Sequence, residues 1–229
     1  ILGNTITSTY SNIKIANETS IYSYQPSNLI LAGGQGGNTL AYSTTGNNWV
    51  GLGNTVFSTQ GSSVGYNGAL WVAGGQGANT LAYSTTGIPA SSWVGLGNSV
   101  FGTNTTSVAW NGQYWIAAGQ GLGNSLAYST TGTSWIGLGN TVFQVQATGL
   151  AWNGTVWVAT GQGSNTLAYS TTGTSWIGLG NTVFAVQGNS IAWNGGIFVA
   201  AGQGANTLAY SLNGTSWIGV GTKVFSVKG

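Results

Sequence analysis

The chain has almost no charge. Its 229 residues include three lysines and one glutamate, and no arginine, aspartate or histidine. The four charges lie near the ends of the chain, at Lys14, Glu18, Lys223 and Lys228. Nucleic-acid binding requires several cations that neutralise phosphates, so we expect no nucleic-acid partner. The polar surface must consist of neutral side chains and backbone, and it should respond little to pH or salt.

The same absences remove the usual catalytic groups. General acid–base catalysis requires a titratable group beside the reacting atom, yet Glu18 is the one carboxylate, and histidine and cysteine are missing. The chain therefore has no carboxylate pair for glycoside hydrolysis. It also has no Ser-His-Asp triad and no set of conventional metal ligands. We predict a protein that is not an enzyme and that uses no cofactor and no metal.

The missing cysteines also exclude disulfides. No apolar run approaches the length of a membrane span, and no basic-then-apolar signal peptide opens the chain. We therefore expect no membrane span. A polar surface without charge suits an extracellular, cell-surface or virion-surface location, which is the location we expect.

What the chain does contain is a repeat. The segment "LAYSTTGTSWIGLGNTVF" at 126–143 returns unchanged at 167–184, and looser copies begin at Leu40, Leu81 and Leu208. With 41% hydrophobic and 12% aromatic residues, these units can bury a core. The tripeptide GQG recurs every 41 to 44 residues, ending at Gly36, Gly77, Gly121, Gly163 and Gly204. Units of about 42 residues are typical of propeller blades.

Each unit has the pattern of short strands rather than helices. In the third unit, four alternating or apolar segments are separated by turn residues, at 107–110, 114–119, 125–129 and 135–139. Asn111-Gly112 joins the first two, and we predict a type I′ hairpin turn, in which both residues have positive φ. No segment carries a helical stripe long enough for a helix.

We therefore predict an all-β fold, a five-bladed β-propeller of four-stranded antiparallel blades. A β-solenoid is the alternative, but its rungs are usually shorter and lack Asn-Gly hairpins. The prediction is one domain, 1–229. Its repeat units are 4–53, 54–97, 98–139, 140–180 and 181–221, followed by a terminal closing strand at 222–229.

One hairpin in each unit resembles a degenerate Asp-box, or BNR, repeat of β-propellers. Ser129, Gly132 and Trp135 match its serine, glycine and aromatic positions, and the same match recurs in "YSLNGTSW" at 210–217. The family's aspartate is replaced in every copy, by Thr45, Thr86, Thr131, Thr172 and Asn213. Sialidases with Asp boxes also need an arginine cluster, so the resemblance implies the fold and not the activity.

Two further likenesses concern the architecture. Five units of this length resemble tachylectin-type five-bladed lectins, without a shared motif. The whole repeat is similar to propeller repeats of large viruses and phages.

The candidate binding residues are the neutral side chains that recur in every unit. Amides both donate and accept hydrogen bonds, so they match sugar hydroxyls, and an aromatic face suits the C–H face of a sugar ring. The amides are Gln35, Gln76, Gln120, Gln162, Gln203, Asn38, Asn79, Asn124, Asn165 and Asn206. The aromatic residues before each hairpin turn are Tyr66, Trp110, Trp152 and Trp193, with Tyr24 in the corresponding place of the first unit.

Structural roles are the alternative for both sets. Amides commonly satisfy backbone groups in loops, and recurring aromatics pack between blades. We expect core positions above all for the tryptophans that close the Asp-box-like hairpin: Trp49, Trp93, Trp135, Trp176 and Trp217. Four sequons permit N-glycosylation, or are chance matches in a chain rich in Asn and Thr: Asn17, Asn104, Asn153 and Asn213.

These observations favour a non-catalytic, multivalent, lectin-like surface module that binds neutral glycans. The alternative is a structural extracellular or virion surface protein that assembles into filaments or a coat. A neutral protein-interaction platform is a third hypothesis.

The two ends of the chain compete for equivalent positions. "LGNTI" at 2–6 and "VGTKVF" at 220–225 both resemble the internal "LGNTVF". In a monomer we predict that the ends meet in the last blade, as a clasp. In a homo-oligomer or filament, a terminal strand would instead pair with a neighbouring copy.

Overall fold

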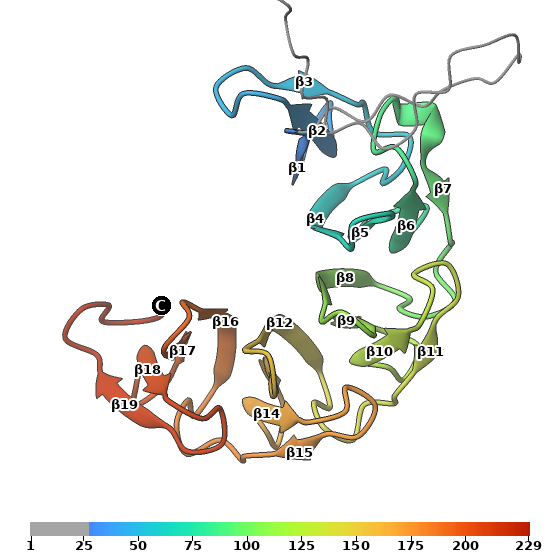
Figure 1. Ribbon diagram of the computed structural model, residues 1–229. Coiled ribbons are helices and arrows are strands. Elements are labelled where there is room, and N and C mark those ends of the chain that lie inside the picture. The colour runs from blue at the N-terminus through green and yellow to red at the C-terminus, as the bar shows by residue number, and fades with distance from the viewer. Residues whose placement is uncertain (1–27) are drawn as a thin grey trace, which may run out of the picture.

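The computed structural model describes residues 28–229, which form five antiparallel sheets placed one after another around an arc (Figure 1). One short 3₁₀ turn, Ala90–Ser92, is the helical element of this part. The all-β, five-bladed prediction is confirmed. Among the described residues, no helix is long and apolar enough to cross a membrane.

We number the sheets as blades 1 to 5. Blade 1 contains β1 (Ile30–Gly33), β2 (Leu40–Ser43) and β3 (Val50–Gly51). Blade 2 contains β4 (Gln60–Tyr66), β5 (Trp71–Gln76), β6 (Leu81–Ser84) and β7 (Val94–Gly95). Blade 3 contains β8 (Asn104–Trp110), β9 (Trp115–Gln120), β10 (Leu126–Ser129) and β11 (Ile136–Gly137).

Blade 4 contains β12 (Gln146–Trp152), β13 (Trp157–Gln162), β14 (Leu167–Ser170) and β15 (Ile177–Gly178). Blade 5 contains β16 (Gln187–Trp193), β17 (Phe198–Gln203), β18 (Leu208–Ser211) and β19 (Ile218–Gly221). Blades 2 to 5 are four-stranded meanders whose first strand lies on the inside of the arc (Figure 1). Blade 1 has three described strands, and its predicted first strand lies outside the described residues.

The hairpin between the first two strands of blades 2 to 5 differs from the predicted type I′ turn. In blade 3, Gly112 has φ of 98°, whereas Asn111 has no positive φ. The N–H of Asn111 donates to the carbonyl of Tyr114 at 3.2 Å, so Gly112 and Gln113 are the central residues. The prediction was wrong by one position, because Asn111 stabilises the turn through its side chain instead of entering the left-handed region.

The apolar core lies between the blades. Each interface joins a forward face, turned towards the next blade, to a rear face of that blade. Between blades 2 and 3 the forward face contributes Val72 and Leu81, and the rear face contributes Phe101, Val108 and Trp115. Three corresponding clusters lie between the other neighbouring blades. Trp115 and its equivalent in blade 4 are fully buried, although the sequence pattern had drawn attention to other tryptophans.

The tryptophans that close the Asp-box-like hairpins are less buried than predicted. Trp93 is buried, Trp135, Trp176 and Trp217 are half-buried, and Trp49 is exposed. Each indole N–H donates to a glycine carbonyl of its own loop, as Trp135 does to Gly132 at 3.1 Å. These rings therefore close loops and cover the edges of the cores.

In blades 2 to 5 the first glycine of GQG is required by this packing. In blade 4 that residue is Gly161 of β13, and a Cβ there would lie 2.5 Å from the ring of Phe143. Phe143 belongs to the connecting segment before the blade and is fully buried. The repeated glycine thus lets a phenylalanine ring lie directly against the strand backbone.

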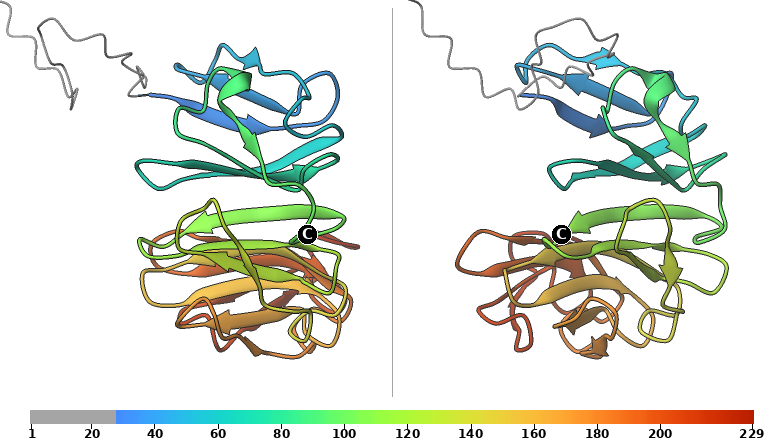
Figure 2. Two further views of the ribbon diagram at one scale, coloured as in Figure 1. Left: turned by 90° about the vertical axis from the view of Figure 1, so that its right-hand side faces the viewer. Right: turned by 45° about the vertical axis from the view of Figure 1, so that its right-hand side comes forward.

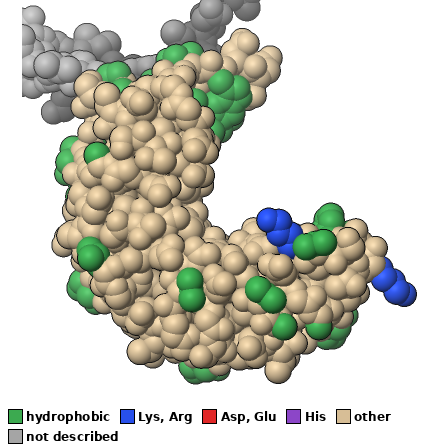
Figure 3. All heavy atoms as spheres, turned by 180° about the vertical axis from the view of Figure 1, so that it is seen from behind, with side chains coloured by type: hydrophobic (Ala, Val, Ile, Leu, Met, Phe, Trp, Pro, Cys, Tyr) green, Lys and Arg blue, Asp and Glu red, His purple; other side chains and the backbone are tan. Residues whose placement is uncertain are grey.

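The five blades form an open arc rather than a closed ring, as the ribbon and the space-filling view both show (Figures 1 and 3). In the described residues the last blade does not meet the first. Residues 222–229 lie against blade 5, where Lys228 pairs with Gln203. The "LGNTI" end lies outside the described residues, so the clasp stays a prediction.

Candidate functional site

The strands of all blades run across the arc, so their connections form two opposite rims (Figure 2). The hairpin rim carries the turns between the first and second strands and the Asp-box-like loops between the third and fourth. The GQG rim carries the loops between the second and third strands. In blade 3, Trp110 pairs with Trp115 at one rim and Asn104 pairs with Gln120 at the other.

This arrangement separates the two sets of candidate binding residues. The recurring aromatics lie at the hairpin rim, and the recurring Gln and Asn lie at the GQG rim. Strand β8 alone has seven residues, which is about 20 Å from end to end. In blades 2 to 5 the amides and the aromatic ring of one blade therefore lie at opposite rims and do not share one site.

The recurring asparagines are structural. In blade 4, Asn165 donates from Nδ2 to the carbonyl of Val142 at 2.8 Å and accepts at Oδ1 from the N–H of Gly180 at 2.8 Å. Both bonds recur at Asn79, Asn124 and Asn206, and the Oδ1 bond recurs at Asn38. In blades 2 to 5 each amide ties the segment entering its blade to the segment leaving it, as the structural alternative expected.

A glycine lies directly over each of these amides. At Gly178, a Cβ would lie 2.2 Å from Oδ1 of Asn165. The same close approach occurs at Gly51, Gly95, Gly137 and Gly219. The second residue of each outer strand is therefore glycine because the asparagine occupies the place of its side chain.

The recurring glutamines have a different environment. Their backbones close the ladder between the first two strands, as Gln162 does opposite Gln146. Their side chains form no hydrogen bond within residues 28–229, and all but the exposed Gln35 are half-buried. They remain available to a ligand on the GQG rim, but no aromatic residue of the candidate set accompanies them there.

The Asp-box-like loops are held by hydroxyl groups at the hairpin rim. In blade 3, Oγ of Ser129 accepts from the N–H of Gly132 at 2.7 Å, and Oγ1 of Thr131 accepts from the N–H of Thr133 at 3.2 Å. In blade 5, Oδ1 of Asn213 accepts from the N–H of Thr215 at 3.0 Å. Threonine and asparagine thus provide a neutral acceptor at the position near that of the family's aspartate.

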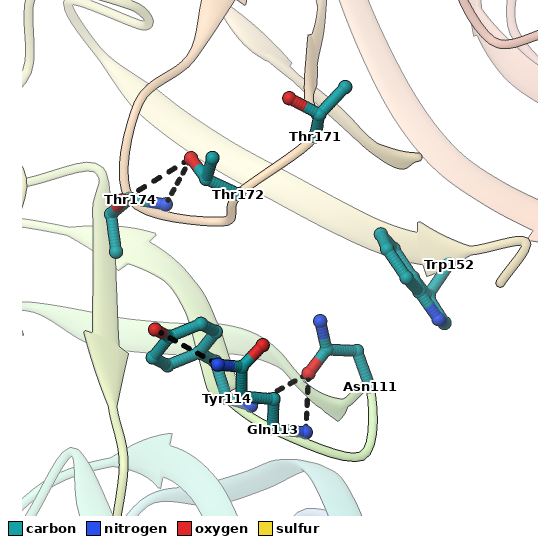
Figure 4. A pocket seen from close by; sticks show the side chains of 7 residues that line it. All are labelled: Asn111, Gln113, Tyr114, Trp152, Thr171, Thr172 and Thr174. Atoms are coloured by element: carbon teal, nitrogen blue, oxygen red, sulfur yellow. Dashed lines mark hydrogen bonds between the residues drawn. The ribbon is translucent and has the colours of Figure 1, made fainter. Parts of the chain in front are cut away.

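A pocket of about 420 Å³ opens on the hairpin rim between blades 3 and 4 (Figure 4). The β8–β9 hairpin, the end of β12 and the β14–β15 loop form its walls. Its lining residues are Asn111, Gln113, Tyr114, Trp152, Thr171, Thr172 and Thr174. Figure 4 shows the threonine loop facing the hairpin residues across the opening, with Trp152 at its side.

Part of this lining maintains the local structure. Oδ1 of Asn111 accepts from the N–H groups of Gln113 and Tyr114, at 2.9 and 2.7 Å. Oγ1 of Thr172 accepts from the N–H of Thr174 at 3.3 Å. The Trp152 ring packs against the Trp157 ring, with centroids 5.1 Å apart, which fixes its orientation. The pocket is therefore shaped before any ligand arrives.

Other groups of the lining are free for a ligand. The indole N–H of Trp152, the hydroxyl of Thr171 and Nδ2 of Asn111 have no hydrogen-bond partner in the described part of the chain. The hydroxyl of Tyr114 accepts one long bond, 3.4 Å from Nε2 of Gln113, and keeps its own proton. Donors and acceptors thus surround an aromatic face, and no charged side chain lines the pocket.

The hairpins of the other blades differ from the β8–β9 hairpin at the lining positions. The positions of Gln113 and Tyr114 are Ala69 and Leu70 in blade 2, and Thr155 and Val156 in blade 4. The aromatic at the end of the first strand is kept, as Tyr66, Trp110 and Trp193. A search for recurring residues could not find Gln113 and Tyr114, whereas Thr171 recurs as Thr44, Thr85 and Thr130. The signal of Gln113 and Tyr114 is the departure of the third unit's hairpin from the other hairpins.

The sequons fall in different environments. Asn153 lies in the β12–β13 hairpin and Asn213 lies in the β18–β19 loop, both on the hairpin rim. Asn104 begins β8, and its Oδ1 is buried without a partner. Asn17 lies outside the described residues.

Comparisons with known proteins support the fold. No protein-family model matches this chain, and curated protein sequences give no significant match. Among solved structures, a nidogen/laminin complex is similar with a TM-score of 0.59 and 9% identity, over 78% of this chain and 70% of that chain. The GH74 enzyme of Niastella koreensis is similar with a TM-score of 0.56 and 21% identity, over 84% of this chain.

A computationally designed protein, Ika8, is also similar, with a TM-score of 0.54 and 14% identity over 82% of this chain. This chain spans 56% of the Ika8 chain and 28% of the GH74 enzyme. At such identities the likeness shows the fold alone. The class defined by fold and comparison is the β-propeller-like repeat protein.

Proposed function

We propose that the protein is a non-catalytic, lectin-like module that binds neutral glycans on its hairpin rim, at the pocket between blades 3 and 4. The observation that carries this proposal is the lining of that pocket. An indole ring held by Trp157 lies beside unpartnered neutral donors and acceptors, and no charged group is present.

A carbohydrate is the ligand class that such a lining fits. Sugar hydroxyls donate and accept, so they can pair with the amide of Asn111 and the hydroxyls of Tyr114 and Thr171. The C–H face of a pyranose can lie on the Trp152 ring. An anionic ligand would find no cation in this pocket. Trp110 and Trp193 occupy the place of Trp152 in blades 3 and 5, and weaker contacts at these rings would add avidity.

The resemblance to Asp-box and tachylectin-type propellers supports a surface role for the whole module. A neutral rim that carries a recurring aromatic ring in successive blades suits recognition of a glycan-covered surface. We therefore place the module outside the cell or on a virion.

Glycan-array screening followed by calorimetry tests this function. Neutral oligosaccharides should bind, and the double variant Tyr114→Phe/Thr171→Ala should weaken binding by about tenfold, because two hydrogen bonds are lost. The matched control is Thr130→Ala, the position equivalent to Thr171 in blade 3, which should leave the affinity within about twofold. Binding restricted to sialylated or sulfated glycans, or equal loss in the control, would contradict the proposal.

A further inference from the structure

Five asparagines of the chain are followed directly by glycine. Four of them occupy the same place in the hairpins between the first and second strands of blades 2 to 5, and we call them the hairpin asparagines: Asn67, Asn111, Asn153 and Asn194. The fifth, Asn213, lies in the β18–β19 loop. Glycine has no Cβ that shields its backbone nitrogen, so this nitrogen can reach the side-chain carbonyl of the preceding asparagine. The five dipeptides are therefore places where the chain can modify itself covalently.

The side-chain carbonyl is held in the same way at all five asparagines. At Asn111 its oxygen accepts from two backbone N–H groups, at 2.9 and 2.7 Å. At the other four asparagines the corresponding two donors lie 2.7 to 3.0 Å from Oδ1. Two donors directed at one carbonyl oxygen stabilise the negative charge that develops on it when a nucleophile adds to the carbonyl carbon. The carbonyl group under attack is thus polarised similarly at every site.

The attacking nitrogen divides the five sites into two groups. In the four hairpins the glycine is exposed, and its N–H has no hydrogen bond in the described part of the chain: Gly68, Gly112, Gly154 and Gly195. In the β18–β19 loop, Gly214 is buried, and its N–H donates to Oγ of Ser211 at 2.8 Å. The fifth site therefore presents the same carbonyl, but its nitrogen is already engaged.

We propose that the hairpin asparagines deamidate spontaneously and that Asn213 is protected from this reaction. The backbone nitrogen of the following glycine gives up its proton and bonds to Cγ of the asparagine. The bond from Cγ to Nδ2 breaks, and Nδ2 leaves with a proton as ammonia, so that a succinimide ring remains. Water then adds to one of the two ring carbonyls, and the bond between that carbonyl and the ring nitrogen breaks. The product is aspartate or isoaspartate, and water is the co-reactant.

The reaction would bring charge to an uncharged rim. No charged side chain lies between Glu18 and Lys223 in the sequence. Each conversion adds one carboxylate, so conversion of all four hairpin asparagines changes the formal net charge from +2 to −2. At Asn111 the new carboxylate lies in the lining of the pocket between blades 3 and 4, where it replaces the Nδ2 donor. The reaction itself does not depend on glycan binding, so either proposal can fail without the other.

Peptide mapping of the folded protein, after incubation at mildly alkaline pH in water enriched in heavy oxygen, tests the proposal. Chymotrypsin cleaves after aromatic residues, so it releases each dipeptide in a short peptide of its own: 67–71, 111–114, 153–157, 194–198 and 211–217. The four hairpin peptides should gain the label at least about tenfold faster than 211–217, because the hydrogen bond of Gly214 must break before its nitrogen can attack. Equal rates at all five sites, or no labelling of the hairpin peptides, would overturn the proposal.

Two serine variants test whether the glycine nitrogen decides the rate. Ser211→Ala removes the acceptor of the Gly214 N–H, and labelling of 211–217 should rise towards the rate of the hairpin peptides. Ser170→Ala is the matched control, because Ser170 holds the corresponding loop of blade 4, where no asparagine precedes the glycine. It should leave all five rates as they are in the parent chain. Circular dichroism verifies that both variants are folded. An unchanged rate at 211–217 in folded Ser211→Ala, or the same rise in the control, would overturn the assigned protection.

Discussion

Asparagine serves different purposes on the two rims of the arc. On the GQG rim, Asn165 uses its oxygen and its nitrogen to join backbone segments far apart in sequence. On the hairpin rim, Asn111 uses only its oxygen, within its own turn, and its Nδ2 remains free beside the pocket. The same residue type thus stabilises the fold at one rim and presents a donor at the other.

The comparison shows that repetition alone does not identify a binding residue. The asparagines of the GQG rim recur in all five units because every blade needs the same link between entering and leaving segments. In the pocket on the hairpin rim, Gln113 and Tyr114 differ from their equivalents in the other units, whereas Thr171 recurs as Thr44, Thr85 and Thr130. The predictions below test this division of roles between the rims.

The largest effect should come from filling the space over an asparagine of the GQG rim. Gly178→Ala would place a Cβ 2.2 Å from Oδ1 of Asn165, and we expect a loss of about 3 kcal/mol in the free energy of unfolding, measured by urea denaturation. Gly37→Ala is the control, because nothing lies within 4 Å of its Cβ position. Similar losses in both variants would mean that the asparagine link does not matter.

Removal of the amide itself should lower the free energy of unfolding by somewhat less than Gly178→Ala does. Asn165→Ala leaves the carbonyl of Val142 and the N–H of Gly180 without these partners, and we expect a loss of about 2 kcal/mol. Gln162→Ala, three residues earlier, removes an amide without hydrogen bonds and should change stability by less than about 0.5 kcal/mol. If Gln162→Ala were the more damaging change, the assignment of roles on this rim would be wrong.

On the hairpin rim, removal of an asparagine side chain should lower the free energy of unfolding by less than it does on the GQG rim. Asn111→Ala removes two bonds within an exposed turn, so we expect a loss of about 1 kcal/mol in thermal or urea unfolding. Asn111→Asp keeps the accepting oxygen and should restore most of that stability, while glycan binding stays reduced because Nδ2 is gone. Full recovery of binding in Asn111→Asp would show that this amide nitrogen is not a contact.

The smallest effect should be the response of either rim to pH. The chain has no histidine and no cysteine, the side chains that most often change charge between about pH 6 and 9. Stability and glycan affinity should therefore change by less than about 0.5 kcal/mol in that range. A clear transition near neutral pH in unfolding curves or in calorimetric affinities would reveal a titrating group that this sequence does not suggest.

Much of the fold could be predicted from local spacing. The interval between successive GQG tripeptides and the alternation in "LAYS" indicated the number of blades and the meander of short strands. The turn type was mispredicted because Asn111 can stabilise a hairpin either through its backbone or through its side chain, and the letters Asn-Gly are the same in both cases.

The binding site was harder to predict for two physical reasons. The partner of Asn165, Val142, lies 23 residues earlier in the chain, so its structural role depends on packing that no local pattern reveals. The curvature of the arc depends on small rotations between blades, and those determine whether the ends meet. Neither the long-range partner of Asn165 nor the rotation between blades is encoded at a single position of the sequence.

The location of the cores between blades has a consequence for how the molecule unfolds. A blade has no apolar interior of its own, so each blade owes its stability to the neighbours on its two sides, as in linear repeat arrays. Blades 1 and 5 each have one neighbouring blade among the described residues. Backbone amides should therefore exchange with solvent fastest at the ends of the arc and slowest in blade 3.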